Sequence, residues 1–381
     1  MNRVAVKPTL LQWACERAGL NVQALSASFP RLQRWVRGDG HPTLKQLEAF
    51  AAKTHTPVGY LLLAEPPVEN VPIPDFRTVA DVRITRPSAN LLDTLYLCQQ
   101  RQVWYRDEAR MLGEPPLAFV ASAQVGDTVV ATARAIRDTL GFSIADRARM
   151  PTWEDALREF VRQADDAGVL TMVNGVVGSS NHRKLDTGEF RGFALSDDLA
   201  PLVFVNGRDT KSAQMFTLAH ELAHIWLGQS ALTDATTQEV PDHVTEGWCN
   251  RVAAELLVPE AALREQFRPS ADVAQEKGRL AREYKVSTLV VLRRLHDIGA
   301  LADAQYWPMV RAETAFLAGI RRSPGGDFYR TLGVRTGRRF ARALVSSTLE
   351  GRASYSEAFR LLGFRKMATF RELGDRLGLG F

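Results

Sequence analysis

The segment Phe216–Gly228 constrains the fold of this chain more than any other, because it spaces two histidines by one helical turn. Residues four apart lie on one face of an α-helix, so His220 and His224 can direct both imidazoles at one metal ion. Zinc suits imidazole ligands, and a catalytic zinc keeps one coordination position for water. Glu221 follows the first histidine and is placed to take a proton from that water. This His-Glu-x-x-His segment therefore predicts a helix that carries a zinc site.

Such a site needs a third protein ligand, and the chain offers several candidates downstream. The extended metzincin pattern requires glycine at 227 and histidine at 230, where this chain has Leu227 and Ser230, so that subtype is excluded. The remaining candidates are Asp242, His243, Glu246, Glu255 and Glu260.

A helix predicted over residues 245–259 favours Glu246 among these candidates. At about 100° per residue, Glu246 points into the apolar arc of this helix, whereas Glu255 lies on its polar side. A lone carboxylate in an apolar setting is costly unless a cation accompanies it, and zinc would be that cation. Asn250, one turn further on the same face, is within reach of a ligand's outer nitrogen. The alternative is that Glu246 merely caps its helix, and His243 is the reserve ligand.

Two neighbouring features leave alternatives open. Cys249 is either an inhibitory thiolate ligand or a small buried core residue, and its place in the apolar arc favours the core residue. The strand predicted over residues 202–205, just before the zinc helix, is either an edge strand that pairs with an extended substrate or a core strand.

At 381 residues the chain is long enough for two or three domains. Four prolines in nine residues, within 65–74, predict an extended linker. Three scattered cysteines exclude a disulfide framework and suit a reducing cytoplasm. The chain has no apolar run long enough to span a membrane and no signal-peptide core, so we expect a cytoplasmic protein. The domains we expect are residues 1–66, residues 67–305 with a core over 150–262, and residues 306–381.

The first of these domains has the pattern of a bundle of short helices. They are expected over residues 10–18, 21–29, 30–37 and 44–54, with a last turn after Pro57. The third is two-faced, and its polar arc consists of Arg31, Gln33, Arg34 and Arg37. A helix that enters the major groove needs this division, so these four residues are candidates for contact with double-stranded DNA. The alternative is an ordinary amphipathic helix.

Beyond the linker the pattern changes from helices to strands and back to helices. Helices are expected over 88–112, 127–140 and 152–167, strands over 169–173, 192–195 and 202–205, and helices from 211 onward. This order predicts an α+β fold that is mostly helical, with a small sheet. A helix, turn and helix over 280–295 is either another nucleic-acid-reading unit or, as we favour, structural packing.

Both ends of the chain are basic. Residues 1–64 carry 8 basic against 3 acidic side chains, and residues 311–381 carry 14 against 6. The basic helical C-terminal region could bind DNA phosphates, an acidic toxin or the acidic centre of the same chain, and the sequence does not rank these partners.

Residues 190–195, 201–207, 216–224 and 246–259 resemble the ImmA/IrrE family of zinc metallopeptidases. The N-terminal segment resembles an XRE-type helix-turn-helix through Trp35-Val36-Arg37-Gly38 and Pro42-Thr43-Leu44. The resemblance implies a gluzincin-like metallopeptidase domain with Zn2+ and the following site residues: His220, His224 and Glu246 as ligands and Glu221 as catalytic base. Cys249 and Val258 depart from the family pattern, which leads us to expect alanine and methionine there.

The resemblance further implies a bacterial stress or mobile-element regulator that cleaves a partner repressor protein. An antitoxin-like role beside a co-encoded toxin is implied as well. The rival hypothesis is a non-proteolytic DNA-binding regulator or antitoxin with a structural or vestigial metal site. The intact Glu221 weighs against this rival, since metal binding alone does not require a carboxylate there. A homodimer is a general expectation for helix-turn-helix proteins, because many bind two half-sites.

Overall fold

The computed structural model describes residues 3–75, 78–79, 82–83, 87–233, 244–319 and 335–380. The chain divides into two compact units, Met1–Pro72 with Ile84–Leu95, and Ile73–Arg83 with Tyr96–Phe381. One boundary between them falls at Pro72 and Ile73, inside the proline-containing linker.

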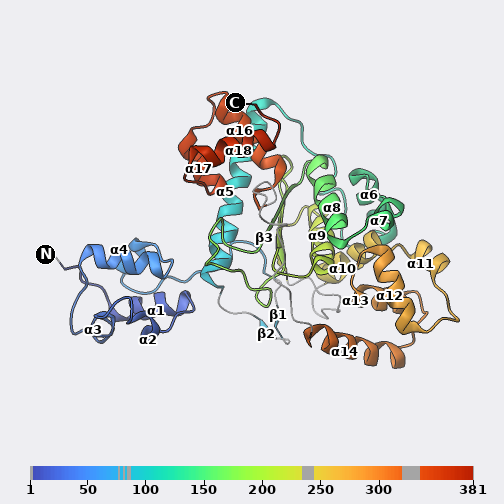
Figure 1. Ribbon diagram of the computed structural model, residues 1–381, viewed down its shortest axis with the longest axis horizontal. Helices are drawn as coiled ribbons and strands as arrows, with labels where there is room; N and C mark the ends of the chain where they lie inside the picture. The colour runs from blue at the N-terminus through green and yellow to red at the C-terminus, as the bar shows by residue number, and fades with distance from the viewer. Residues whose placement is uncertain are drawn as a thin grey trace. The chain divides into compact units, whose positions relative to one another are not determined.

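The N-terminal unit contains a bundle of short helices (Figure 1). They are α1 (Pro8–Arg17), α2 (Val22–Leu25), α3 (Leu32–Arg37), α4 (Leu44–Lys53) and a 3-10 helix, η1 (Val58–Leu62). Thr43 starts α4 with a capping box: its hydroxyl accepts from the Gln46 backbone N–H, and the Gln46 side chain accepts from the Thr43 backbone N–H. This capping satisfies backbone groups at the start of α4 and stabilises the helix.

Two helices of this unit are shorter than the sequence predicts. The second ends at Leu25 instead of residue 29, and the third begins at Leu32 instead of residue 30. Pro30 lies between the two helices and disfavours the helical conformation of Phe29, the residue before it. The chain therefore turns between the two helices.

A four-stranded sheet with the order β3-β5-β4-β6 lies in the second unit. The strands are β3 (Leu170–Asn174), β4 (Gly192–Leu195), β5 (Leu202–Asn206) and β6 (Ala231–Thr233). β5 runs parallel to β3 and antiparallel to β4, which in turn is antiparallel to β6. Since β5 is paired along both sides, the core-strand interpretation of residues 202–205 is right and the edge-strand interpretation is wrong.

β6 contradicts the prediction that only helices follow residue 211. Three residues are too few to show the alternation of polar and apolar side chains that marks a strand. All three are buried, and β6 exists because its backbone pairs with β4.

Helices pack against both faces of the sheet (Figure 1). On one face lie α8 (Trp153–Ala167) and α9 (Lys211–Trp226), and α10 (Val244–Leu257) packs against α9. On the other face lies the part of α5 (Ala89–Leu112) that belongs to this unit, from Tyr96 onward, and α16 (Arg338–Leu349) contacts β3 and α8. The sheet is thus the middle layer, and α9 is held between it and α10.

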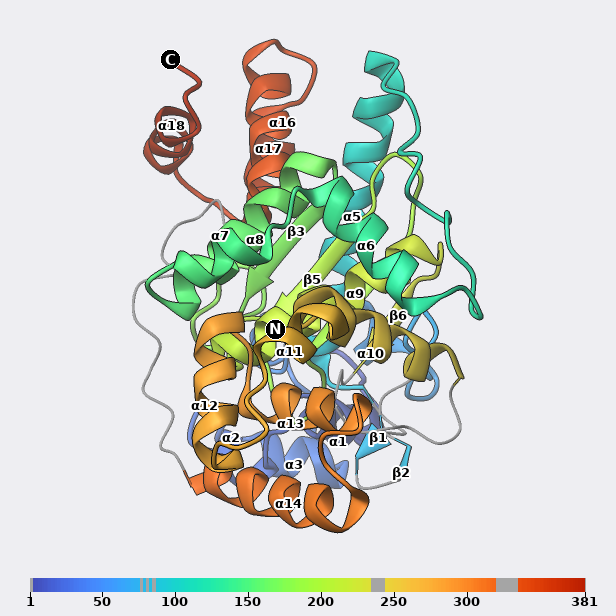
Figure 2. The same ribbon diagram turned by 90° about the vertical axis from the view of Figure 1, so that its right-hand side faces the viewer.

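The remaining elements extend this arrangement, with α12, α13 and α14 gathered together (Figure 2). They are α6 (Val129–Leu140), α7 (Ile144–Arg149), α11 (Glu260–Gln266), α12 (Val273–Tyr284), α13 (Thr288–Asp297), α14 (Asp303–Gly319), α17 (Tyr355–Leu362), α18 (Met367–Arg376) and the paired strands β1 (Thr78–Val79) and β2 (Val82–Arg83). No helix in the described ranges has both the length and the apolar character needed to cross a membrane.

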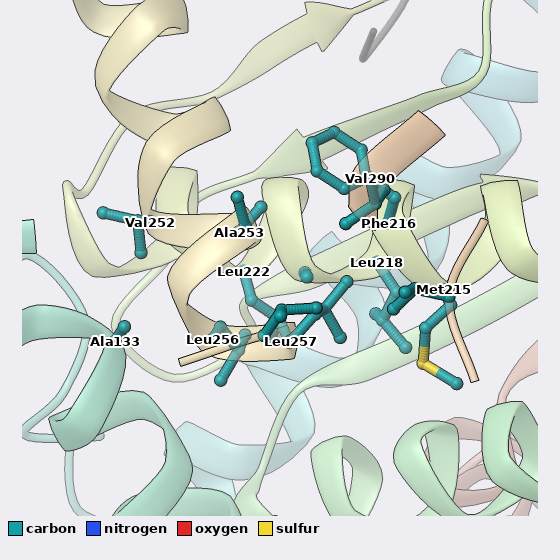
Figure 3. Close-up of a cluster of buried hydrophobic side chains, with 14 of the residues drawn as sticks. Ala133, Met215, Phe216, Leu218, Leu222, Val252, Ala253, Leu256, Leu257 and Val290 are labelled. Atoms are coloured by element: carbon teal, nitrogen blue, oxygen red, sulfur yellow. The ribbon is translucent and has the colours of Figure 1, made fainter. Parts of the chain in front are cut away.

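The main core lies between α9, α10 and their neighbours (Figure 3). Leu218 and Leu222 of α9 share it with Leu256 and Leu257 of α10, and Val290 of α13 reaches the same cluster. α12 and α13 therefore bury their apolar faces against the rest of this unit. This packing agrees with the structural interpretation of residues 280–295.

Candidate metal centre

α9 holds the two histidines inside the protein. The helix starts at Thr210, whose hydroxyl accepts from the Ala213 backbone N–H, and its residues from 214 to 226 are buried. His220 and His224 have no solvent-exposed surface. Their Nε2 atoms lie 3.1 Å apart. The helical spacing seen in the sequence thus turns both rings toward one point.

α10 supplies a carboxylate to the same point. Glu246 places Oε2 3.2 Å from Nε2 of His220 and Oε1 3.0 Å from Nε2 of His224. Ligand atoms of the three side chains lie within 4.8 Å of one another, and all three residues are buried. Glu246 of α10 is more than twenty positions from both histidines of α9 in the chain, yet the three side chains meet.

The geometry of this cluster fits a zinc ion. With zinc–nitrogen bonds of about 2.0–2.1 Å in a tetrahedral site, ligand atoms lie about 3.3 Å apart. The separations of 3.0–3.2 Å between the two imidazole nitrogens and the carboxylate oxygens are close to that value. Two imidazoles and one carboxylate are also a ligand set that catalytic zinc sites use.

Asn250 sets the orientation of the first imidazole. Its Oδ1 lies 2.9 Å from Nδ1 of His220, so this nitrogen carries the proton and donates it to the amide oxygen. The lone pair of Nε2 then faces Glu246 and His224. An outer partner of this kind fixes the tautomer of a metal-binding histidine.

Glu221 lies beside the cluster and keeps one oxygen available. Oε1 accepts a hydrogen bond from the Thr233 hydroxyl of β6, and Oε2 is buried with no hydrogen-bond partner in the described part of the chain. The pKa of Glu221 is raised to about 8, mainly by burial and also by the charge of Glu246, while His220 and Thr233 oppose the shift. The carboxyl group can therefore take up a proton near neutral pH.

The three clustered side chains are electrostatically coupled. Burial disfavours the charge on Glu246, yet the two histidines hold its pKa well below the ordinary value. Burial likewise opposes charge on His220, but Glu246 and Asn250 raise its pKa overall, whereas burial lowers the pKa of His224. In this cluster the buried carboxylate of Glu246 thus faces the ring nitrogens of His220 and His224.

Gly192 of β4 is a site residue that sequence reasoning missed. A Cβ at this position would lie 2.6 Å from Cγ2 of Thr217, 2.9 Å from Oε1 of Glu221 and 2.9 Å from the Phe204 carbonyl oxygen. Only glycine leaves room for the Glu221 carboxylate against the sheet. A glycine at the start of a predicted strand is the signal that could have indicated this close approach.

The other candidate ligands lie elsewhere or outside the described residues. Asp242 and His243 fall outside the residues that the structure describes. Glu260 pairs with Arg264 on the surface at 2.8 Å. Glu255, predicted on a polar face, is in fact buried, because Arg294 of α13 packs against α10 and forms an ion pair with it.

Cys249 is fully buried in the main core. Burial raises the pKa of its thiol well above the ordinary value, and the charges of Glu246 and Glu221 raise it further. A thiol that resists ionisation is a poor metal ligand. These observations favour the interpretation of Cys249 as a small core residue.

The candidate DNA-contacting residues lie on the surface of the N-terminal unit. α3 buries Leu32 and Trp35 in the core of that unit. All four residues of the predicted polar arc are exposed: Gln33, Arg34 and Arg37 lie in α3, whereas Arg31 precedes the helix as its N-cap residue. The helix therefore has the two-faced form that the sequence predicts, and contact with DNA stays a prediction.

The basic C-terminal region has acidic and polar partners within its own unit. Arg352 pairs with the buried carboxylate of Glu108 in α5 at 2.8 Å. Arg339 donates from Nε to the Tyr105 hydroxyl at 2.7 Å. The sequence leaves open whether this region binds DNA phosphates, an acidic toxin or the acidic centre of the same chain. These contacts favour the same chain.

Comparisons with known proteins give the central region a family. Residues 165–296 match the model of the IrrE N-terminal-like domain. The match extends from the end of α8 to α13 and contains the sheet and the buried cluster. The domain that these residues form belongs to the ImmA/IrrE family. Residues 336–376, which contain α16 to α18, match a Domain of unknown function (DUF8813).

A curated relative is similar to this chain over a shorter stretch. A stretch of 101 residues is 32% identical to the radiation response metalloprotease IrrE of Deinococcus radiodurans. It covers 25% of this chain and 31% of that protein, so the chain matches about a third of the length of the relative.

Proposed function

We propose that this protein is a zinc-dependent endopeptidase that cleaves a partner repressor protein and binds double-stranded DNA through its N-terminal unit. The observation that carries the proposal is the convergence of His220, His224 and Glu246 in a buried triangle, with Glu221 beside it. The similarity to a radiation response metalloprotease supports the same reaction class.

The residues divide the work of peptide hydrolysis among them. When bound, Zn2+ would polarise the scissile carbonyl and lower the pKa of a water molecule. His220, His224 and Glu246 would hold the ion, and Asn250 keeps His220 in the tautomer that this requires. Glu221 would accept a proton from the attacking water and deliver it to the leaving nitrogen.

The regulatory part of the proposal rests on the N-terminal unit. Arg34 and Arg37 of α3 and Arg31, its N-cap residue, are exposed. Exposed cations on a helix that packs against a bundle suit contacts with phosphates and base edges. A peptidase joined to such a unit would act on a repressor or on the partner of a co-encoded toxin. The protein encoded by the neighbouring reading frame is the first substrate to test.

The substitution Glu221→Gln tests this proposal. It keeps the shape of the side chain and leaves the proposed ligands intact, so zinc content and fold should be unchanged. Cleavage of the neighbouring protein should fall by about 10²–10⁴-fold, because the proton acceptor is lost. The measurement is the rate of appearance of the cleavage products, with Glu260→Gln, a carboxylate of α11 paired on the surface, as the matched control.

The control variant should cleave at the rate of the unaltered protein. If Glu221→Gln left both cleavage and reporter repression unchanged, Glu221 would not be the base. Repression or toxin neutralisation that persisted with no cleavage by any variant would favour the non-proteolytic regulator.

A further inference from the structure

The outer edge of β6 carries a short segment of the interdomain linker. β6 pairs with β4 on one side. On the other side the Leu232 backbone N–H donates to the Pro74 carbonyl oxygen at 2.9 Å, and Asp75 forms a parallel bridge with Leu232. Pro74 and Asp75 thus add a short backbone pairing to the outer edge of the sheet, just after the boundary at Pro72.

This edge lies next to the proposed catalytic base. Thr233, the neighbour of Leu232 in β6, donates its hydroxyl to Oε1 of Glu221. An extended backbone paired with Leu232 therefore lies one residue along the strand from a side chain that touches Glu221. A free strand edge presents backbone donors and acceptors that fit any extended peptide, whatever its side chains.

The linker offers this edge few backbone N–H donors. Pro72 and Pro74 have no backbone N–H, so neither can donate to the strand. Pro74 is exposed, and Ile73 and Asp75 are half-buried. Proline favours an extended backbone that is ready to pair, which lowers the entropy lost on docking. A segment held in this way can be displaced by a peptide that offers more backbone hydrogen bonds.

We propose that the outer edge of β6 is a docking site for an extended peptide backbone and that the linker segment Ile73–Asp75 occupies it in cis. A peptide supplied by another protein then competes with the linker for Leu232. Binding at this edge is independent of the metal, whereas the identity of the peptide as substrate rests on the proposed function. Because the linker continues directly into the N-terminal unit, the chain itself connects that unit to the docking edge.

Hydrogen–deuterium exchange of the Leu232 amide tests this inference without any measurement of activity. The test variant replaces Ile73-Pro74-Asp75 with Gly-Ser-Gly, and the matched control makes the same replacement at Glu65-Pro66-Pro67 of the same linker. Gly-Ser-Gly keeps the backbone carbonyl that accepts from Leu232 but loses the extended preference of proline, so docking costs more entropy. Exchange at Leu232 should therefore be about two- to tenfold faster in the test variant. Exchange in the control should equal that of the unaltered protein.

The second arm of the experiment adds a peptide in trans. The probe is the acetylated and amidated peptide with the sequence of residues 70–75. It should restore slow exchange at Leu232 in the test variant and bind that variant at least about threefold more tightly than the unaltered protein, because no linker competes. Equal affinity for both proteins, or unchanged Leu232 exchange in the test variant, would overturn the inference. Since neither readout requires zinc or cleavage, failure of the proposed function would leave this result interpretable.

Discussion

The metal centre of α9 and α10 and the polar face of α3 both follow from helical spacing, yet the structure constrains them very differently. His220, His224 and Glu246 are buried and contact one another. Arg34 and Arg37 of α3 are exposed. Buried polar groups must satisfy one another, so their neighbours indicate their chemistry, whereas exposed groups face water and their partner has to be found by experiment.

The C-terminal region adds a second contrast. Its arginines outnumber those of the N-terminal unit, but Arg352 and Arg339 are bonded to Glu108 and Tyr105. A basic segment can therefore belong to a folded domain as much as to a nucleic-acid surface. The burial and bonding partners of the arginines, and not their charge, distinguish a folded domain from a nucleic-acid surface.

Among the variants that test this comparison, Gly192→Ala at the buried centre should have the largest effect on stability. The added methyl group would collide with Thr217, Glu221 and the Phe204 carbonyl. We expect the free energy of unfolding to fall by about 3 kcal/mol, at the upper end of the range for overpacked cores. Urea denaturation measures this change.

Gly247→Ala is the matched control. Gly247 lies in α10 beside Glu246, and a Cβ there meets only the end of the Arg251 side chain at 3.5 Å. This variant should gain about 0.5–1 kcal/mol, because alanine is the better helix former. Equal destabilisation of both variants would contradict the close approach at Gly192.

Arg34→Ala, on the exposed face, should weaken DNA binding and leave the stability of the fold almost unchanged. If Arg34 reads a base edge, binding to a duplex selected from a random DNA library should weaken by about 1–3 kcal/mol. The free energy of unfolding should change by less than about 0.5 kcal/mol, since the side chain is exposed. Filter binding or fluorescence anisotropy gives the affinity.

Arg371→Ala, which alters an exposed arginine of α18, serves as the control for charge alone. It should leave the affinity for the selected duplex unchanged. Unaltered DNA affinity in Arg34→Ala would count against α3 as the recognition helix.

The smallest effect is expected from Asp165→Asn in α8. The Asp165 carboxylate accepts from the backbone N–H groups of Thr171 and Arg338, and burial raises its pKa to about 7. A carboxyl whose pKa is higher in the folded state stabilises the fold below its unfolded pKa of about 4 and loses that contribution as the pH rises to about 7. The Tm of the unaltered protein minus that of the variant should therefore decrease by about 2–4 °C as the pH rises across this range.

Calorimetry at several pH values measures this difference. A Tm difference that stayed constant or grew with pH would contradict the assignment of this titration to Asp165.

Much of the site could be predicted from the sequence, because its parts lie on two helices with regular spacing. The interval from His220 to His224 and the apolar surroundings of Glu246 are local patterns. Asn250 follows from the same helical geometry. Each of these inferences needs only the angle of about 100° per residue and the cost of an unpaired buried carboxylate.

The missed parts depend on contacts between distant segments. Gly192 and Thr233 reach Glu221 only because β4 and β6 pair and α9 crosses them. Likewise, Glu255 is buried because α13, which follows far along the chain, brings Arg294 against it. Spacing within one helix contains no information about such neighbours, and a three-residue strand carries too little pattern to be recognised.

The most direct test of the account is elemental analysis of the purified protein and of Glu246→Ala. The account predicts about one zinc ion per chain in the unaltered protein and in Glu221→Gln. It predicts a large loss of zinc in Glu246→Ala, with the helical content retained by circular dichroism. Absence of stoichiometric metal from the unaltered protein, or an undiminished zinc content in Glu246→Ala, would contradict it.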